Sequence, residues 1–166
     1  TNPEHKEIDM MFNFDLISHV WNNNELAKFE PNIPNLLGMK EIFKRWQNDL
    51  RGKGWNTLFY ENHDLARAVS NFGNDRFYRV ESAKALAYML YFQQGTPYIY
   101  QGQEIGMTNA YYTKLSDYDD IDTKGNYNKI VVENKTVCHD AMIRGLQLGS
   151  RDNTRAPMQW DDSANA

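Results

Sequence analysis

Residues 57–64 read TLFYENHD, so that four β-forming residues pass directly into a polar cluster. Residues 96–104, TPYIYQGQE, make the same transition, and a short apolar run at residues 9–14 predicts a strand upstream of both. Apolar residues at three- and four-residue intervals predict helices over 34–50 and 80–94, one between each pair of strands. The order strand, helix, strand, helix, strand is typical of parallel βαβ units with right-handed crossovers.

Three parallel strands cannot close a barrel, because a (β/α)8 barrel needs about 250 residues. At 166 residues the chain is therefore either a small open α/β sheet or the last part of a barrel. Beyond residue 106 the sequence is rich in Asp, Asn, Thr and Tyr, and it has one possible helix, around 140–148. We expect the rest of residues 107–166 to be irregular. Because the sequence starts without methionine and ends with no closing element, we also expect a longer parent protein.

Charge and cysteine content exclude several classes of protein. With 22 acidic and 18 basic residues the net charge is -4, so the chain lacks the basic surface that binds nucleic acid or anionic membranes. Its polarity comes largely from amides, since 18 residues are asparagine. Cys138 is the only cysteine, which excludes an internal disulfide and predicts a reducing, cytoplasmic setting. No window approaches the roughly 18 apolar residues of a membrane span.

Candidate functional residues follow the second and third predicted strands, where parallel α/β proteins build their sites. His63 and Asp64 follow one strand, Glu104 follows the next, and Arg67 lies a turn beyond Asp64. Carboxylates and imidazoles bind sugar hydroxyls, so a carbohydrate site is predicted, with Asp64 and Glu104 as a conceivable acid and nucleophile pair. The structural alternative is that Asp64 caps the next helix and His63 is a buried, hydrogen-bonded histidine.

Metal, nucleotide and thiol sites are not predicted, and we expect no cofactor. The four histidines lack metal-ligand spacing, and the acidic run at 117–122 lacks the glycine and terminal glutamate of an EF-hand, so a solvated loop is expected there. No phosphate-binding glycine pattern occurs. Cys138 and His139 are adjacent, so their side chains point apart on a helix or a strand.

Three longer motifs carry a family resemblance. Residues 61–73, ENHDLARAVSNFG, resemble the fourth signature region of the α-amylase family of glycoside hydrolases. Residues 95–107, GTPYIYQGQEIGM, and residues 151–161, RDNTRAPMQWD, resemble its oligo-1,6-glucosidase branch, which includes dextran glucosidase and trehalose-6-phosphate hydrolase. The motifs occur in the order of that family and extend over nearly the whole chain.

The resemblance implies the closing part of a TIM (β/α)8 barrel, with strands six, seven and eight at 10–14, 57–60 and 96–100. Residues 1–106 would form a partial catalytic domain, and residues 107–166 an irregular excursion after strand eight that carries the RDNTRAPMQWD motif. In this family the aspartate nucleophile and the glutamate acid follow strands four and five, so both are expected upstream of this chain. Any structural calcium is likewise expected outside it.

The resemblance also implies roles for individual side chains. Asp64 matches the third acidic residue of the family, which binds sugar hydroxyls and stabilises the oxocarbenium-like transition state. His63 matches its hydrogen-bonding neighbour, Arg151 matches the arginine that anchors the terminal glucose, and Arg67 is expected to join them in substrate binding. Glu104 is expected to support the site from behind, without contacting substrate.

Four positions depart from the usual pattern of the branch, which has Asn, Pro, Glu and Thr where this chain has Glu61, Ala66, Gln103 and Ala156. Glu61 is expected to support the site indirectly, either by placing a second negative charge near Asp64 or by pairing with Arg67. These departures affect the expected specificity, and the resemblance to the family is unaffected.

The function implied is that of an α-glucosidase that hydrolyses α-glucosidic bonds, α-1,6 above all, in short oligosaccharides by a retaining mechanism. The alternative is a non-catalytic member that binds carbohydrate or a protein partner, although intact His63, Asp64 and Arg151 weigh against it. Without nucleophile and acid, the isolated chain is expected to be inactive. It is also expected to self-associate, or to be partly disordered over 107–166, because its remaining barrel partners are missing.

Overall fold

The computed structural model describes residues 4–5 and 8–164 and contains a small parallel sheet. Its strands are β1 (Met10–Met11), β2 (Trp55–Leu58) and β3 (Thr96–Pro97), in the order β1-β2-β3. Met10 pairs with Trp55 and Thr57 pairs with Thr96, both in parallel register. The predicted parallel βαβ order is therefore confirmed, although β1 and β3 are shorter than their β-forming runs and β2 begins and ends two residues earlier than its run.

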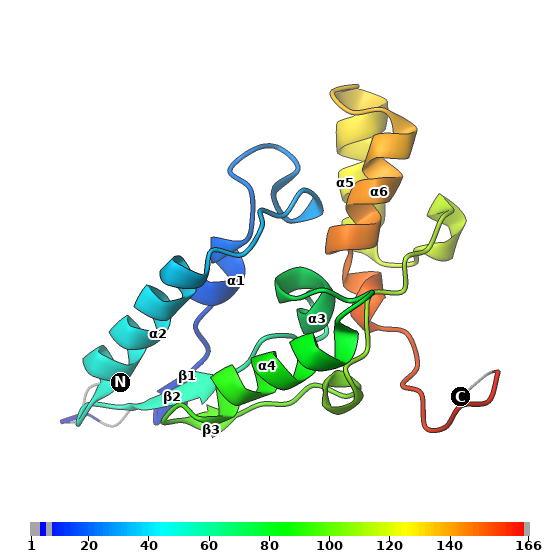
Figure 1. Cartoon of the computed structure of the whole chain (residues 1–166). Helices are drawn as coiled ribbons and strands as arrows, with labels where there is room; N and C mark the ends of the chain where they lie inside the picture. Colours follow the sequence, from blue (N-terminus) through cyan, green and yellow to red (C-terminus); the bar gives the residue numbers. More distant parts are fainter. Residues whose placement is uncertain (1–3, 6–7, 165–166) are drawn as a thin grey trace.

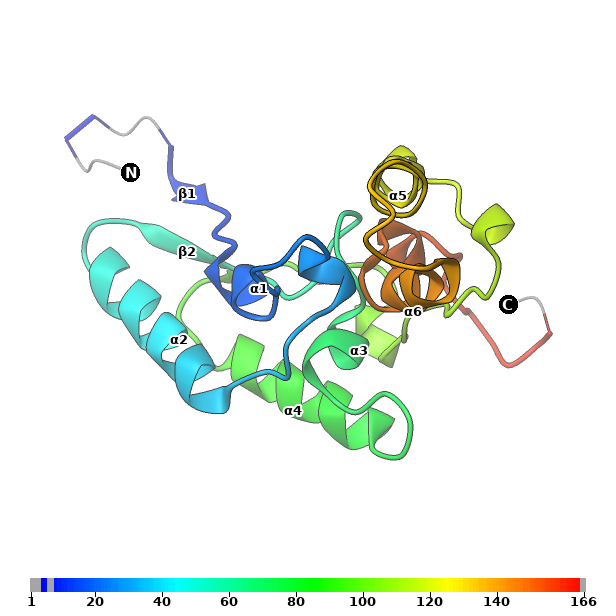
Figure 2. The same cartoon turned by 90° about the horizontal axis from the view of Figure 1, so that it is seen from above.

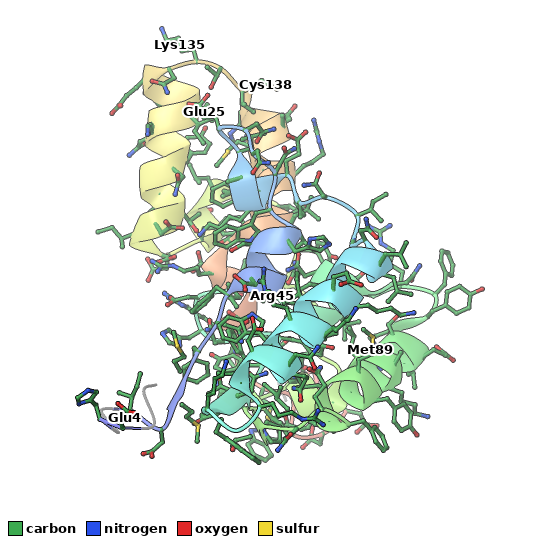
Figure 3. The ribbon with its side chains drawn as sticks, turned by 90° about the vertical axis from the view of Figure 1, so that its left-hand side faces the viewer. Glu4, Glu25, Arg45, Met89, Lys135 and Cys138 are labelled. Carbon is green, nitrogen blue, oxygen red and sulfur yellow. The ribbon has the colours of Figure 1, made fainter. Side chains whose placement is uncertain are left out.

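Two long helices connect the strands and cover the sheet. They are α2 (Leu36–Leu50) and α4 (Arg79–Tyr91), close to the helices predicted over 34–50 and 80–94. Asn35 begins α2, because its side chain accepts hydrogen bonds from the backbone N–H groups of Leu37 and Gly38. Figure 3 shows α2, which carries Arg45, lying beside α4, which carries Met89.

The main core lies between these helices and the central strand. Met39 from α2, Leu58 from β2 and Leu90 from α4 are all buried in it. Two short helices complete this part of the chain: α1 (Asp15–His19) follows β1, and α3 (Ala68–Phe72) precedes α4 (Figures 1 and 2). Asp15 of α1 holds α2 in place by accepting a hydrogen bond from Trp46 Nε1 at 2.6 Å.

Residues 107–164 contain more helix than the single one expected around 140–148, which corrects the expectation that the rest of this segment is irregular. They contain α5 (Ile121–Tyr127), a π-helical turn η4 (Asn128–Glu133) and α6 (His139–Gly149), of which the first two were not predicted. Figures 1 and 2 show α5 and α6 side by side, with the pair rising away from the sheet. The α5 sequence, IDTKGNY, carries a glycine and β-branched residues and has no apolar stripe, so local propensity did not indicate a helix.

Tertiary packing stabilises this helical pair. Buried Ile130, Met142 and Leu146 form a second core, which Phe29 joins from the segment that follows α1. Figure 3 shows Glu25 of that segment near Lys135 and Cys138 in the turn between the two helices. Four short 3-10 turns complete the described secondary structure: η1 (Ala27–Phe29), η2 (Gln103–Ile105), η3 (Leu115–Asp117) and η5 (Arg151–Thr154). Within residues 4–5 and 8–164, no helix combines the length and the apolar character needed to cross a membrane.

Candidate active site

The loop that leaves the carboxyl end of β2 presents the two predicted residues, His63 and Asp64. Asn62 shapes the loop by accepting a hydrogen bond from the Asp64 N–H at 2.8 Å. The side chain of Asp64 is 46% exposed and that of His63 is 69% exposed, and their polar atoms lie 3.4 Å apart. Arg67 occupies the N-cap of α3, which has no side-chain cap. The alternative of a capping aspartate and a buried histidine is therefore wrong.

Arg151 reaches Asp64 from the far end of the chain. It begins η5, where Ser150 caps the turn by accepting a hydrogen bond from the Asp152 N–H. Arg151 Nη1 donates to Asp64 Oδ1 at 3.1 Å, although the two residues are 87 positions apart in sequence. The fold thus brings together His63, Asp64 and Arg151, to which the family resemblance assigns site roles, at the carboxyl end of the sheet.

Asp120 is a site residue that the sequence reasoning missed. Arg151 binds it with two hydrogen bonds, from Nε to Oδ2 at 2.6 Å and from Nη2 to Oδ1 at 2.8 Å. The Asp120 side chain is only 3% exposed, and its backbone N–H donates to the Asp152 carboxylate at 3.2 Å. Hydrogen bonds from Arg151 hold the pKa of Asp120 below its usual value, and Asp120 in turn raises the pKa of Arg151.

Arg155 is the second residue that was missed. Its guanidinium donates to Asp64 Oδ1 at 3.2 Å and to Asp120 Oδ1 at 3.3 Å, and its Nε donates to the His63 carbonyl at 2.9 Å. Two arginines therefore bridge a half-exposed and a buried aspartate, an arrangement that we call the arginine clamp (Asp64, Asp120, Arg151 and Arg155). The only sequence signal for it was the proximity of Arg155 to Arg151 in one motif.

The acidic run at 117–122 is not a uniformly solvated loop, which corrects that expectation. Asp119 is fully exposed, whereas its neighbour Asp120 is buried in the arginine clamp. A hollow of about 480 Å³ adjoins the clamp, lined by Tyr112, Asp117, Asp119, Asp120, Ile121, Asp152 and Arg155. In the part of the chain that the structure describes, no three His, Cys, Asp or Glu side chains are grouped so as to hold a metal ion.

The remaining predicted residues lie away from the exposed part of the site. Arg67 has no exposed side-chain surface and pairs with Glu61 at 3.0 Å, so one of the two roles expected for Glu61 is realised. Glu104 is exposed on η2 and lines a cavity of about 420 Å³ together with Arg79 and Tyr91. Asp64 does not line this cavity. The fold therefore separates Glu104 from Asp64.

The arrangement is suited to binding a polar, uncharged ligand. Asp64 presents a carboxylate that is oriented by two guanidiniums and still half exposed, so it can accept hydrogen bonds from hydroxyl groups. Asp120 balances the positive charge of both arginines from the buried side. The clamp contains two aspartates and two arginines, so it presents no large net charge to a ligand.

Comparison with known proteins identifies relatives over the whole chain. The family model of the alpha amylase catalytic domain matches residues 1–166. An oligo-1,6-glucosidase of Heyndrickxia coagulans is 44% identical over all of this chain and 30% of its own length. An alpha-glucosidase of Pediococcus pentosaceus is 45% identical over 96% of this chain and 29% of its own.

Solved structures give the same result. The trehalose-6-phosphate hydrolase of Bacillus licheniformis superimposes with a TM-score of 0.88 at 41% identity, over 99% of this chain and 29% of that chain. An isomaltulose synthase from Klebsiella superimposes with a TM-score of 0.90 at 40% identity, over the same shares. The chain spans less than a third of the length of these relatives. Its three-stranded sheet corresponds to part of the barrel in the solved structures. With the family model matched from end to end, the chain belongs to the α-amylase family of catalytic domains.

Proposed function

We propose that the chain is part of an α-glucosidase that hydrolyses α-glucosidic bonds in short oligosaccharides, with α-1,6 bonds preferred. The observation that carries the proposal is the contact of Asp64 with Arg151, which joins two motif regions 87 residues apart at the carboxyl end of a parallel sheet. In barrels of this type, active sites lie at that end. Relatives named oligo-1,6-glucosidase and glucan 1,6-alpha-glucosidase support the linkage preference.

We assign β1, β2 and β3 to strands six, seven and eight of the complete barrel. The motif order supports this assignment, because residues 61–73 follow β2, residues 95–107 contain β3, and residues 151–161 come after both. The nucleophile and the general acid of the retaining mechanism would then lie outside this chain, and the chain alone would be inactive. Cys138 is free and exposed, which suits the cytoplasmic setting that we propose for the protein.

In this proposal Asp64 acts in the transition state. Its carboxylate accepts hydrogen bonds from sugar hydroxyls, and these bonds strengthen as the ring distorts and positive charge develops at the anomeric carbon. His63, exposed beside it, donates to a neighbouring hydroxyl, and Arg151 holds the terminal glucose. Arg67 is buried, so we assign it no contact with substrate.

The proposal predicts a large loss of activity when Asp64 is neutralised. In the full-length protein, Asp64→Asn should lower kcat for p-nitrophenyl α-glucoside by about 10³-fold, because one charged transition-state contact is lost. Asp140→Asn serves as the control, since Asp140 is exposed near the start of α6 and lies outside both the clamp and the hollow beside it. Isomaltose, maltose and trehalose-6-phosphate as competing substrates then identify the linkage.

Two outcomes would contradict the proposal. If Asp64→Asn retained the wild-type kcat, Asp64 would have no role in the transition state. If the wild-type protein bound these sugars without hydrolysing any of them, the protein would be a non-catalytic carbohydrate-binding member of the family.

A further inference from the structure

A buried guanidinium lies beneath the exposed site and joins three segments of the chain. Arg67 has no exposed side-chain surface, and its Nη1 donates to Glu61 Oε1 at 3.0 Å and to the Gln101 carbonyl at 2.7 Å. Its Nη2 donates to the Thr154 carbonyl at 3.4 Å. Gln101 follows β3, and Thr154 ends η5, the turn that begins with Arg151. One side chain therefore connects the loops after β2 and β3 to the segment that carries Arg151.

The backbone on either side of Arg67 is held by further hydrogen bonds. The Ala68 N–H donates to Glu61 Oε2, so both oxygens of the Glu61 carboxylate are occupied. The Arg67 N–H donates to Asn109 Oδ1 at 2.9 Å, and Asn109 Nδ2 donates to the Gln147 carbonyl at 3.0 Å near the end of α6. The loop is thus tied, through Asn109, to the helix that leads into η5.

The space around the guanidinium is filled. Met107 Sδ lies 3.6 Å from Arg67 Nη2, and the Tyr100 ring centroid lies 5.4 Å from the guanidinium carbon. A Cβ on Gly102, whose φ is +90°, would lie 2.3 Å from Met107 Sδ and 3.1 Å from Arg67 Nη1. Glu61 supplies the opposite charge in this space. Burial raises the pKa of Glu61 above its usual value, although the Ala68 N–H and Arg67 partly lower it.

The position of Asp64 in this loop is symmetrical. It lies three residues after Glu61 and three residues before Arg67, so the ion pair closes a loop with Asp64 at its centre. We propose that the Glu61–Arg67 ion pair is a positioning element that holds Asp64 in contact with Arg151. Glu61 and Arg67 touch no substrate, and they act by fixing the two segments that carry those residues. The kinetic part of this inference rests on the proposed function.

The test compares Arg67→Lys and Glu61→Gln with the wild type in the full-length protein. A lysine keeps the positive charge but lacks the planar guanidinium group. It therefore cannot donate hydrogen bonds to Glu61, Gln101 and Thr154 together. Glu61→Gln keeps the size of the side chain and removes its charge. A displacement of about 1 Å at a reacting centre costs about 10²-fold, so we expect kcat to fall by about that factor in each variant. Because Asp64 acts in the transition state, KM should change far less.

Controls separate positioning from loss of stability. Met39→Ala removes a buried side chain of the main core, remote from the loop, and should lower Tm while kcat stays at the wild-type value. The double variant Glu61→Gln, Arg67→Met leaves no unpaired buried charge, and it replaces any single variant that does not fold. Crystal structures of the variants should show the contact between Asp64 and Arg151 broken.

A lowered Tm with unchanged kcat in Glu61→Gln would overturn the inference, because the ion pair would then be structural only. An inactive wild-type protein would instead overturn the proposed function. In that case the crystal structures decide the inference alone: an Asp64–Arg151 contact that stays at 3.1 Å in the variants overturns it, and a broken contact supports it.

Discussion

Asp120 is the residue that holds the two arginines of the site in place. It is almost fully buried, and it accepts two hydrogen bonds from Arg151 and one from Arg155. Both arginines also donate to Asp64, which is half exposed. Asp120 therefore keeps both guanidiniums oriented from the buried side, where they hold Asp64 Oδ1.

Asp120→Asn should destabilise the full-length protein by about 2 kcal/mol near neutral pH, because a charged hydrogen-bonded partner is lost. Hydrogen bonding to Arg151 lowers the folded-state pKa of Asp120, so this contribution is fully present above the unfolded value of about 3.9. It is lost as the pH falls through the folded-state pKa. Urea titrations of the wild type and Asp120→Asn between pH 7 and pH 2.5 measure this contribution as the difference between their free energies of unfolding.

Asp119→Asn provides the matched comparison for that measurement. Its carboxylate is fully exposed beside Lys124, so the substitution should change the free energy of unfolding very little at any pH. A stability difference for Asp120→Asn that grew as the pH fell would contradict the assignment of a charged, Arg151-bound Asp120.

At the level of elements, α6 depends on an unusually close approach to the segment that contains η1. Gly145 and Gly149 face this segment, and a Cβ on Gly145 would lie 2.9 Å from the Phe29 carbonyl oxygen. On Gly149 it would lie 2.2 Å from the Lys28 carbonyl oxygen. Since Gly149 lies two residues before Arg151, this contact also determines where η5 begins.

Gly149→Ala should therefore destabilise the full-length protein by about 2 kcal/mol, because the added methyl group would overlap backbone atoms that cannot rotate away. Gly125→Ala is the matched control. Gly125 lies in α5, and a Cβ added there would meet no atom within 4 Å, so alanine should be neutral or stabilise the protein by about 0.5 kcal/mol. Urea unfolding compares the two, and equal stability of both variants would exclude the close approach of α6.

For the molecule as a whole, the exposed face of the sheet is aromatic. Phe12, Phe14 and Tyr98 are each more than 40% exposed, and Phe12 contacts both Phe59 and Tyr98 edge to face, with ring centroids 5.1 Å and 4.8 Å apart. Among the described residues, β1 and β3 each pair only with β2, so each leaves one strand edge unpaired. Such a surface is typical of a sheet that requires further strands.

The 166-residue chain by itself should consequently self-associate through this face. Light scattering at increasing concentrations should give a mass above that of one chain, and Phe12→Ser should reduce it. Phe77→Ser is the control, because Phe77 is 88% exposed and lies before α4, outside the sheet. A monodisperse monomer at all concentrations would contradict this expectation.

The sequence determined much of the fold locally. Apolar spacing predicted α2 and α4, and the position of His63 and Asp64 directly after the second predicted strand placed them at the carboxyl end of the sheet. The motifs, on their resemblance to one family, placed Arg151 with them. The helices and the position of His63 and Asp64 depend on residues that are neighbours in sequence. Arg151 lies 87 positions from Asp64, so its place in the site came from the family resemblance and not from local pattern.

Only the tertiary structure decided what lies between the motifs. Asp120 looked like one member of an acidic loop, and its burial under two arginines depends on contacts 31 and 35 residues away. Arg67 looked like a substrate ligand until the structure placed its side chain beneath the site, beside Glu61. The helix α5 has no apolar stripe of its own and depends on packing within its helical pair. In each case the deciding free energy comes from desolvation and long-range contacts, which a local sequence pattern does not contain.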